Sequence, residues 1–160
     1  MFFDERVLAI IPARGGSKGL PRKNILETNS RPLISWTIQQ AKRSKYIDKV
    51  IVSTDDESIA KISMDEGADV PFLRPARLAT DTAKTIDTVK HLVDKLNEAG
   101  EIYDVIVLLE PTSPLRKKDD IDLTIDALRR GGNFDGAVTL GRFKTHPDLA
   151  KTVEGNKVVQ

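Results

Sequence analysis

Residues 7–25 read Val-Leu-Ala-Ile-Ile-Pro-Ala-Arg-Gly-Gly-Ser-Lys-Gly-Leu-Pro-Arg-Lys-Asn-Ile. The run from Val7 to Ala13 is short and apolar, as in a buried strand. It opens into a loop that carries Gly15, Gly16 and Gly19. Glycines let a backbone turn sharply and bring its N–H groups close to a ligand. The stretch therefore predicts a leading strand followed by a ligand-binding loop.

Positive charge is concentrated in the same loop. Its four cations are Arg14, Lys18, Arg22 and Lys23, and no acidic residue lies between positions 6 and 27. Such a loop favours a strongly anionic ligand, most simply a polyphosphate, although a solvated basic loop is the alternative. The glycine spacing fits neither the P-loop motif nor the dinucleotide motif. We therefore expect a nucleotide site unlike that of a P-loop kinase or a dinucleotide oxidoreductase.

The composition excludes several other classes of site. The chain has 160 residues with 39% hydrophobic and 31% charged residues, which is ordinary for one globular domain. A net charge of +1 gives no global reason to expect nucleic acid or an anionic membrane as a partner. Because cysteine is absent, disulfides and thiolate metal sites are excluded. The leading apolar run is too short to span a bilayer, so a cytoplasmic location is expected.

Strand-like and helix-like segments alternate along the chain. Short apolar or β-branched runs predict strands at 7–13, 49–54, 70–73, 104–109 and 134–140. Helical spacing of apolar residues predicts helices at 32–44, 55–64, 85–97 and 119–130, and the tail at 149–160 reads as a hairpin. This order predicts one α/β domain over residues 1–160, in three layers, with a mainly parallel sheet and helices on both faces.

Two segments carry more detailed expectations. The run at 104–109 is the most apolar in the chain, which predicts a strand covered on both faces. In the helix at 85–97, an inward stripe is expected from Ile86, Val89, Val93 and Leu96. The irregular segments 12–24, 74–85 and 110–116 all follow strands directly. In a parallel sheet such loops meet beyond the carboxyl ends of the strands, so the three should line one cleft.

Several charged residues in these loops have both a functional and a structural interpretation. Arg74 is either a second contact to an anion or base, or a surface arginine packed on its own loop. Glu110 ends the most apolar strand, as binding residues commonly do, or simply reaches water. Asp55 and Asp56 follow a strand, where they can hold a divalent metal or cap the next helix.

Four blocks of sequence, in this order, resemble the acylneuraminate cytidylyltransferases, the CMP-sialic acid synthetases. They are residues 11–24, 52–55, 74–82 and 111–116. The resemblance implies a Rossmann-like nucleotide-diphosphosugar transferase fold. It also implies a reaction in which the anomeric 2-hydroxyl of a nine-carbon 2-keto sugar acid attacks the α-phosphorus of CTP. The products are a CMP-sugar and pyrophosphate, and Mg²⁺ assists.

The resemblance further implies a set of site residues. Nucleotide binding is expected at Ala13, Arg14, Ser17, Lys23, Asn24, Arg74, Ala83 and Thr85. Within this set Arg14 and Lys23 are expected to be catalytic, because phosphoryl displacement mostly needs positioning and neutralisation of developing charge. Backbone groups of the loops can read the edge of the cytosine. Glu110 is expected to contact the sugar, at a position where the family often has Gln. Because of this difference, the resemblance does not decide whether the sugar is sialic, legionaminic or pseudaminic acid.

Family members continue well past this length, so the chain reads as truncated at its C-terminus. The ligands of Mg²⁺, further sugar contacts and most of the segment that forms a homodimer are expected outside these 160 residues. The chain alone is therefore expected to bind nucleotide and to have little or no activity. Two alternatives are a cytidylyltransferase for the eight-carbon acid of lipopolysaccharide and a non-catalytic nucleotide-binding module of the same fold.

Overall fold

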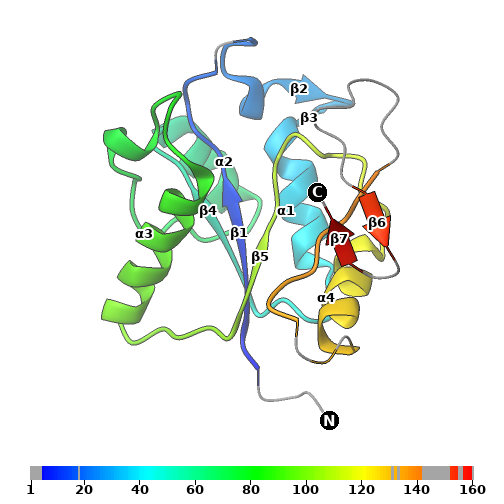
Figure 1. The fold of residues 1–160 in the computed structure, drawn as a ribbon. Helices are drawn as coiled ribbons and strands as arrows, with labels where there is room; N and C mark the ends of the chain where they lie inside the picture. Colours follow the sequence, from blue (N-terminus) through cyan, green and yellow to red (C-terminus); the bar gives the residue numbers. More distant parts are fainter. Residues whose placement is uncertain are drawn as a thin grey trace.

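A computed structural model describes residues 5–17, 19–130, 132 and 134–141, together with the backbone of two short strands near the C-terminus. Its centre is a parallel three-stranded sheet in the order β4-β1-β5 (Figure 1). These strands are β1 (Val7–Pro12), β4 (Lys49–Ser53) and β5 (Val105–Leu108). The leading strand of the sequence is thus the central strand of the sheet.

The position of β1 explains its composition. Val7, Leu8, Ala9, Ile10 and Ile11 are all 0% exposed. A strand with neighbours on both edges and cover on both faces buries every side chain, so it reads as a continuous apolar run. The register sets Ile10 between Ile51 of β4 and Leu108 of β5. The loop after β1 is therefore anchored on a fully buried strand.

Helices cover both faces of the sheet, as the sequence predicts. One face packs against α1 (Leu33–Lys42), α2 (Glu57–Asp65) and α4 (Asp120–Arg130), and the other against α3 (Thr85–Glu98). In Figure 1, α3 lies on one side of the strands, and α1 and α4 lie on the other. The first core contains Ala9 and Ile38, and the second contains Ile10 and Leu92. The three-layer α/β prediction is confirmed.

The remaining elements are short. Two 3-10 helices, η1 (Lys23–Ile25) and η2 (Ala76–Leu78), lie in the loops after β1 and before α3. A hairpin joins β2 (Glu27–Thr28) to β3 (Arg31–Pro32) through Asn29 and Ser30, which both have positive φ. The antiparallel pair β6 (Thr152–Glu154) and β7 (Lys157–Val159) agrees with the predicted tail hairpin. No described helix has both the length and the apolar character needed to cross a membrane.

Two predicted strands are wrong. At 70–73 the chain is irregular, and only Asp69 bridges to Ile51 of β4. Pro71 has no N–H to continue the ladder. Residues 134–140 form no strand, and Phe134, Val138 and Leu140 are 42%, 70% and 55% exposed. Their alternating pattern finds no neighbouring strand among the described residues, and strand propensity without pairing does not make a strand.

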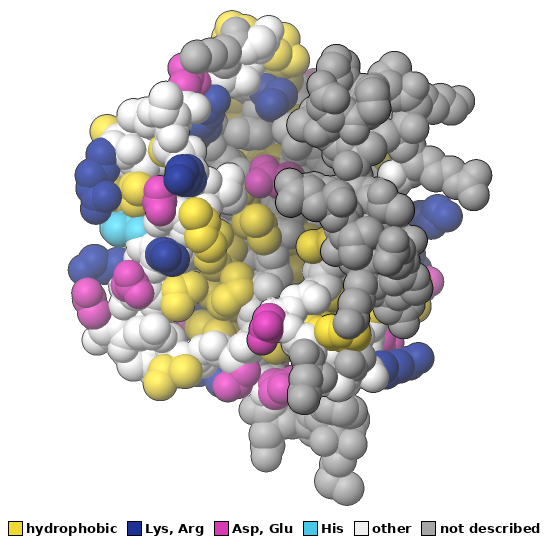
Figure 2. Space-filling model, in the orientation of Figure 1, with side chains coloured by type: hydrophobic (Ala, Val, Ile, Leu, Met, Phe, Trp, Pro, Cys, Tyr) yellow, Lys and Arg dark blue, Asp and Glu magenta, His cyan; other side chains and the backbone are white. Residues whose placement is uncertain are grey.

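The prediction that β5 is covered on both faces is also wrong. Val105 and Val107 pack against the core under α1 and α4, whereas Ile106 and Leu108 are 36% and 46% exposed. The reason is that α3 packs on β1 and β4 and does not cover the same face of β5. Hydrophobic side chains consequently gather on the surface between α3 and β5 (Figure 2).

The inward face of α3 differs from the expected stripe by a small rotation. Thr88, Leu92 and Leu96 are its buried residues, while Ile86 is 53% exposed. Val89 and Val93 are partly buried beside them. This rotation turns the hydroxyl of Thr88 toward the loop that contains Arg74. The helix therefore contributes directly to the cleft described below.

Candidate nucleotide site

One cleft is lined by residues from three loops, namely 12–24, 74–88 and 110–112. The first loop follows β1, the second follows the bridge beside β4, and the third follows β5. All three leave the carboxyl ends of parallel strands, where ligands bind in sheets of this kind. The predicted convergence of the three segments is confirmed.

The cleft brings together most of the residues expected there. Those that line it are Arg14, Ser17, Lys23, Asn24, Arg74, Ala83, Thr85 and Glu110. Ala13 does not line it. Its side chain is 0% exposed, and its N–H donates to the carbonyl of Ser53 at 2.9 Å, which extends the β1–β4 ladder. Ala13 therefore holds the base of the loop.

Two side chains, one outside the loop 12–24 and one at its end, hold the backbone of this loop. The N–H of Gly15 donates to Oδ1 of Asp55 at 3.0 Å, and Nδ2 of Asn24 donates to the carbonyl of Arg14 at 3.0 Å. A Cβ at Gly15 would lie 2.9 Å from Cβ and Oδ2 of Asp56, which is too close. Only glycine allows this approach, so the loop is a preformed cradle.

The cations of the loop are not equivalent. Nη1 of Arg14 forms an ion pair with Oδ1 of Asp81 at 2.8 Å, and the two side chains are 34% and 40% exposed. Among the described residues Lys23 forms no ion pair, although its side chain lines the same cleft. Lys18 lies outside the described residues. An incoming anion thus meets one unpaired cation and one that has an exchangeable partner.

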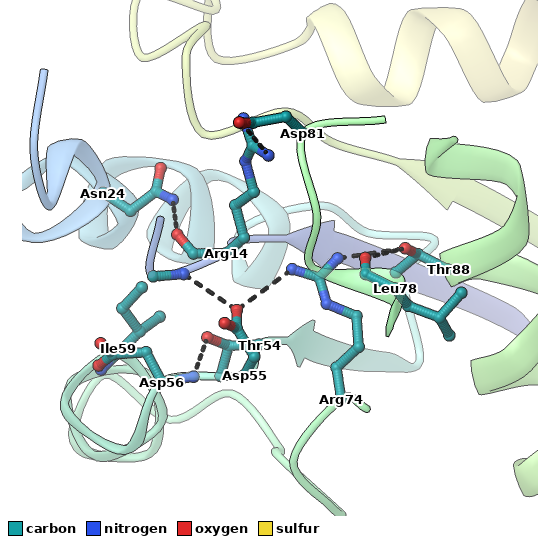
Figure 3. Close-up of polar contacts among 11 residues, drawn as sticks. Arg14, Asn24, Thr54, Asp55, Asp56, Ile59, Arg74, Leu78, Asp81 and Thr88 are labelled. Carbon is teal, nitrogen blue, oxygen red and sulfur yellow. Dashed lines mark hydrogen bonds and ion pairs between the residues drawn. The ribbon is translucent and has the colours of Figure 1, made fainter. Parts of the chain in front are cut away.

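Arg74 is buried rather than on the surface, which removes the surface-arginine interpretation. The residue is 6% exposed, and its backbone N–H donates to Thr54 at 2.7 Å. Nη1 donates to Oγ1 of Thr88 at 3.2 Å, and Nη2 lies 3.6 Å from Oδ1 of Asp55 (Figure 3). Among the described residues, Nε and Nη2 have no hydrogen-bond partner. Burial lowers the pKa of the Arg74 guanidinium, and the Asp55 charge opposes that shift.

Unsatisfied donors on a buried guanidinium are costly, because each has lost its hydrogen bonds to water. Arg74 lines the cleft, but Nε and Nη2 are themselves shielded from solvent, so a ligand acceptor can satisfy them only when the neighbouring side chains shift. Leu78 and Thr88, which are 8% and 2% exposed, line the same end. This inner end therefore combines an apolar wall with hydrogen-bond donors.

Glu110 lies at the cleft end of β5. Desolvation by the cleft walls raises the pKa of its carboxyl, and Arg116 and Lys23 oppose the shift. Arg116 also shapes the loop, since it donates to the carbonyls of Glu110 and Ser113 at 2.8 Å each. The sequence analysis did not single out Arg116, Leu78 or Thr88. A threonine one turn after Thr85 was the available signal for Thr88.

The two acids after β4 are both engaged by the protein. Asp56 caps α2, because its Oδ1 accepts from the N–H groups of Ser58 and Ile59 at 2.8 and 3.0 Å. Asp55 accepts a hydrogen bond from the N–H of Gly15 and forms an ion pair with Arg74. Within the described part of the chain, no group of three or more acidic or histidine side chains could hold a metal ion. Asp56 therefore serves as the expected helix cap, and the metal-binding interpretation of the pair stays a prediction.

Comparison with known proteins agrees with this architecture. A sequence profile described as cytidylyltransferase matches residues 8–159. The CMP-N,N'-diacetyllegionaminic acid synthase of Legionella pneumophila is 38% identical over 155 residues, which are 96% of this chain and 66% of that protein. The N-acylneuraminate cytidylyltransferase of Escherichia coli O18:K1:H7 is 43% identical over 116 residues, 72% of this chain and 26% of that protein.

A solved structure supports the fold independently. CMP:2-keto-3-deoxy-manno-octonic acid synthetase complexed with CTP aligns with a TM-score of 0.65 at 22% identity, over 78% of this chain and 48% of that one. The fold is thus that of the Rossmann-like nucleotidyltransferases. Because the profile match covers nearly the whole sequence, the chain belongs to the cytidylyltransferase family. It spans less than two thirds of the length of either relative described above.

Proposed function

We propose that this protein acts in the transfer of CMP from CTP to a nine-carbon 2-keto sugar acid. The observation that carries the proposal is the cleft itself, in which a cation-rich loop and a buried arginine with unsatisfied donors face one space. The named relatives, a legionaminic acid synthase and an N-acylneuraminate cytidylyltransferase, support the sugar class. Family membership supports CTP as the donor.

In this proposal the base occupies the inner end of the cleft. Nε and Nη2 of Arg74 can donate to a carbonyl acceptor of cytosine, and Leu78 offers an apolar wall to the ring. Ala83 and Thr85, which line the neighbouring wall, are assigned to the ribose and base. A site built to hydrogen-bond one base rejects others, because its buried polar groups would then stay unpaired.

The phosphates are assigned to the other end of the cleft. Arg14, Ser17 and Lys23 line it, and Asn24 holds the carbonyl of Arg14 in place. In the reaction the oxygen of the sugar 2-hydroxyl forms a bond to the α-phosphorus of CTP and its proton is lost to solvent. The bond from the α-phosphorus to the bridging oxygen breaks, and pyrophosphate leaves. Arg14 and Lys23 neutralise the charge that develops on the phosphoryl oxygens.

Glu110 is assigned to the acceptor sugar. It lies just after β5, far along the sequence from the cation-rich loop, and it lines the same cleft as that loop. A carboxylate repels the carboxylate of the sugar acid, so we assign it to a sugar hydroxyl. Mg²⁺ enters the proposal only as the ion that accompanies CTP, and no residue of this chain is assigned to it. The resemblance also implies a cytoplasmic location and, for the longer gene product, a homodimer, which sedimentation of that purified product would test.

Two measurements test the proposal. Isothermal calorimetry with MgCTP and MgATP should show binding of CTP at least about tenfold tighter, equivalent to about 1.4 kcal/mol. No affinity for CTP, or equal affinity for ATP, would overturn the nucleotide assignment. A pyrophosphate-release screen with sialic, legionaminic, pseudaminic and eight-carbon acids, made on the longer gene product that the sequence analysis expects, should give turnover with a nine-carbon acid. CTP binding without turnover on any acid would identify a non-catalytic nucleotide-binding module instead.

A further inference from the structure

One carboxylate oxygen joins two separate parts of the cleft. Oδ1 of Asp55 accepts the N–H of Gly15 at 3.0 Å and lies 3.6 Å from Nη2 of Arg74. In Figure 3 Asp55 lies between the loop that carries Arg14 and the side chain of Arg74. Gly15 lies between Arg14 and Gly16, which line the outer end of the cleft, and Arg74 lines the inner end. Asp55 is therefore in contact with both ends at once.

The charge of Asp55 decides what Arg74 can bind. A buried guanidinium next to a carboxylate forms a pair with no net charge. Within the described residues Nε of Arg74 has no acceptor, and Nη2 has only the 3.6 Å ion pair with Asp55. A neutral carbonyl can satisfy these donors without adding charge. A phosphate would bring excess negative charge to a buried site that already contains a carboxylate, and that is unfavourable. The inner end is thus suited to an uncharged acceptor.

The outer end has the opposite character. Lys23 is without an ion pair among the described residues, and the Arg14–Asp81 pair is partly exposed. Exposed pairs are weak and exchange readily with other anions. Anionic groups therefore gain most at the outer end, and the two ends of the cleft differ in the charge they accept.

We propose that Asp55 is a positioning residue that sets the direction in which the nucleotide enters the cleft. By compensating Arg74, it reserves the inner end for the uncharged pyrimidine and leaves the outer end to the triphosphate. This inference rests on the proposed function, because it assumes that the ligand is a pyrimidine nucleotide. The charge of Asp55 would explain why the base, and not the triphosphate, enters the inner end.

The test uses the two halves of the ligand as separate probes, cytidine and inorganic tripolyphosphate, with the whole chain. In the wild-type protein, saturating tripolyphosphate should leave the cytidine Kd unchanged within about twofold. In Asp55→Asn, whose amide oxygen still accepts from Gly15, tripolyphosphate gains a second cationic site at Arg74. Its affinity should rise about three- to tenfold, and it should displace cytidine. Asp56→Asn, which still caps α2, should behave as the wild type.

A merely structural role of Asp55 predicts something different. Asp55→Asn would then weaken cytidine and tripolyphosphate by similar factors and create no competition between them, and this outcome would overturn the inference. If the wild-type protein does not bind CTP at all, the proposed function itself fails. A wild type that prefers CTP, with an unaltered Asp55→Asn variant, removes only the role of Asp55.

A second pair of variants applies if Asp55→Asn does not fold. In Arg74→Gln the Asp55 charge is uncompensated and should weaken tripolyphosphate binding about threefold or more relative to the wild type. Asp55→Asn/Arg74→Gln leaves no charge at the inner end and should restore the wild-type affinity. Equal affinities in these two variants would show that the Asp55 charge has no influence on the cleft and would refute the proposal.

Discussion

Arg14 and Asp81 form a 2.8 Å ion pair that joins the loop after β1 to the loop before α3. The guanidinium therefore has a carboxylate partner in the protein before any nucleotide arrives. A triphosphate must exchange with that carboxylate to reach Arg14. The pair thus fixes the direction of the Arg14 side chain and also competes with the ligand.

The first prediction concerns this competition. Asp81→Asn should tighten tripolyphosphate binding by a factor of about 1.4 to 5, because an exposed ion pair contributes about 0.2–1 kcal/mol. Calorimetry at two salt concentrations measures it, and the gain should shrink at high salt. Weaker binding by the variant would mean that Asp81 mainly orients Arg14 and that competition is minor.

The second prediction concerns the close approach at Gly15. A methyl group there would meet Cβ and Oδ2 of Asp56 at 2.9 Å, so Gly15→Ala must displace the loop. Overpacking of this kind costs about 1–3 kcal/mol of folding free energy. Because a preformed cradle must return to its wild-type position to hold the ligand, part of this cost should appear as weaker CTP binding, by about fivefold where 1 kcal/mol is transferred. Gly19→Ala is the matched control, since nothing lies within 4 Å of its Cβ. Equal CTP affinities for the two variants would contradict a preformed cradle.

The third prediction concerns Lys23. In the longer gene product that the sequence analysis expects, Lys23→Ala should reduce the rate of pyrophosphate release by about 10²–10³-fold, because one preorganised charge contact can supply roughly 3–4 kcal/mol to a transition state. Lys90→Ala, which removes an exposed lysine on α3 outside the cleft, should keep the wild-type rate. A Lys23→Ala variant with an unchanged rate would remove Lys23 from the catalytic assignment.

The fourth prediction concerns the pH dependence of stability. The cleft raises the pKa of Glu110, so the folded protein holds its proton more tightly than the unfolded chain does. The stability from this effect is fully present below the ordinary glutamate pKa and is lost as pH rises through the raised value. Between the ordinary glutamate pKa and the raised pKa, the wild type should therefore lose stability relative to Glu110→Gln. Above the raised pKa, the difference in unfolding free energy between the two proteins should stay constant.

Thermal unfolding of the wild type and of Glu110→Gln between about pH 4 and pH 8 measures the difference. Raising the pH should lower the unfolding midpoint of the wild type relative to the variant. A wild type that instead gains stability on the variant with rising pH would mean that Arg116 and Lys23 outweigh the burial of the carboxyl.

Much of the fold and of the cleft could be predicted from sequence, because both depend on local patterns. Helices with a clear apolar spacing begin and end within a few residues of the predicted bounds, as at 85–98. The three loops meet because each follows a parallel strand, which is a rule of topology that sequence order reveals. Residues as far apart as Arg14 and Glu110 could therefore be assigned to one cleft.

The errors come from features that depend on neighbours in space. The stretch at 134–140 alternates like a strand, yet it has no partner among the described residues. The open face of β5 depends on where α3 lies, which the apolar run itself does not encode. The contact of Asp55 with Gly15 and Arg74 joins three separate loops, so helix capping or metal binding seemed equally good readings of this acid.

The central place of β1 has a consequence for how the chain folds during synthesis. Its N-terminal end meets the start of β5, where the N–H of Arg6 donates to Asp104, 98 residues further on. On the ribosome, the first strand therefore waits without one of its neighbours until β5, at residues 105–108, has emerged. Contacts so distant in sequence form slowly. Nucleotide can consequently stabilise a nascent chain only after residues 110–112, the last of the three cleft segments along the sequence, have emerged.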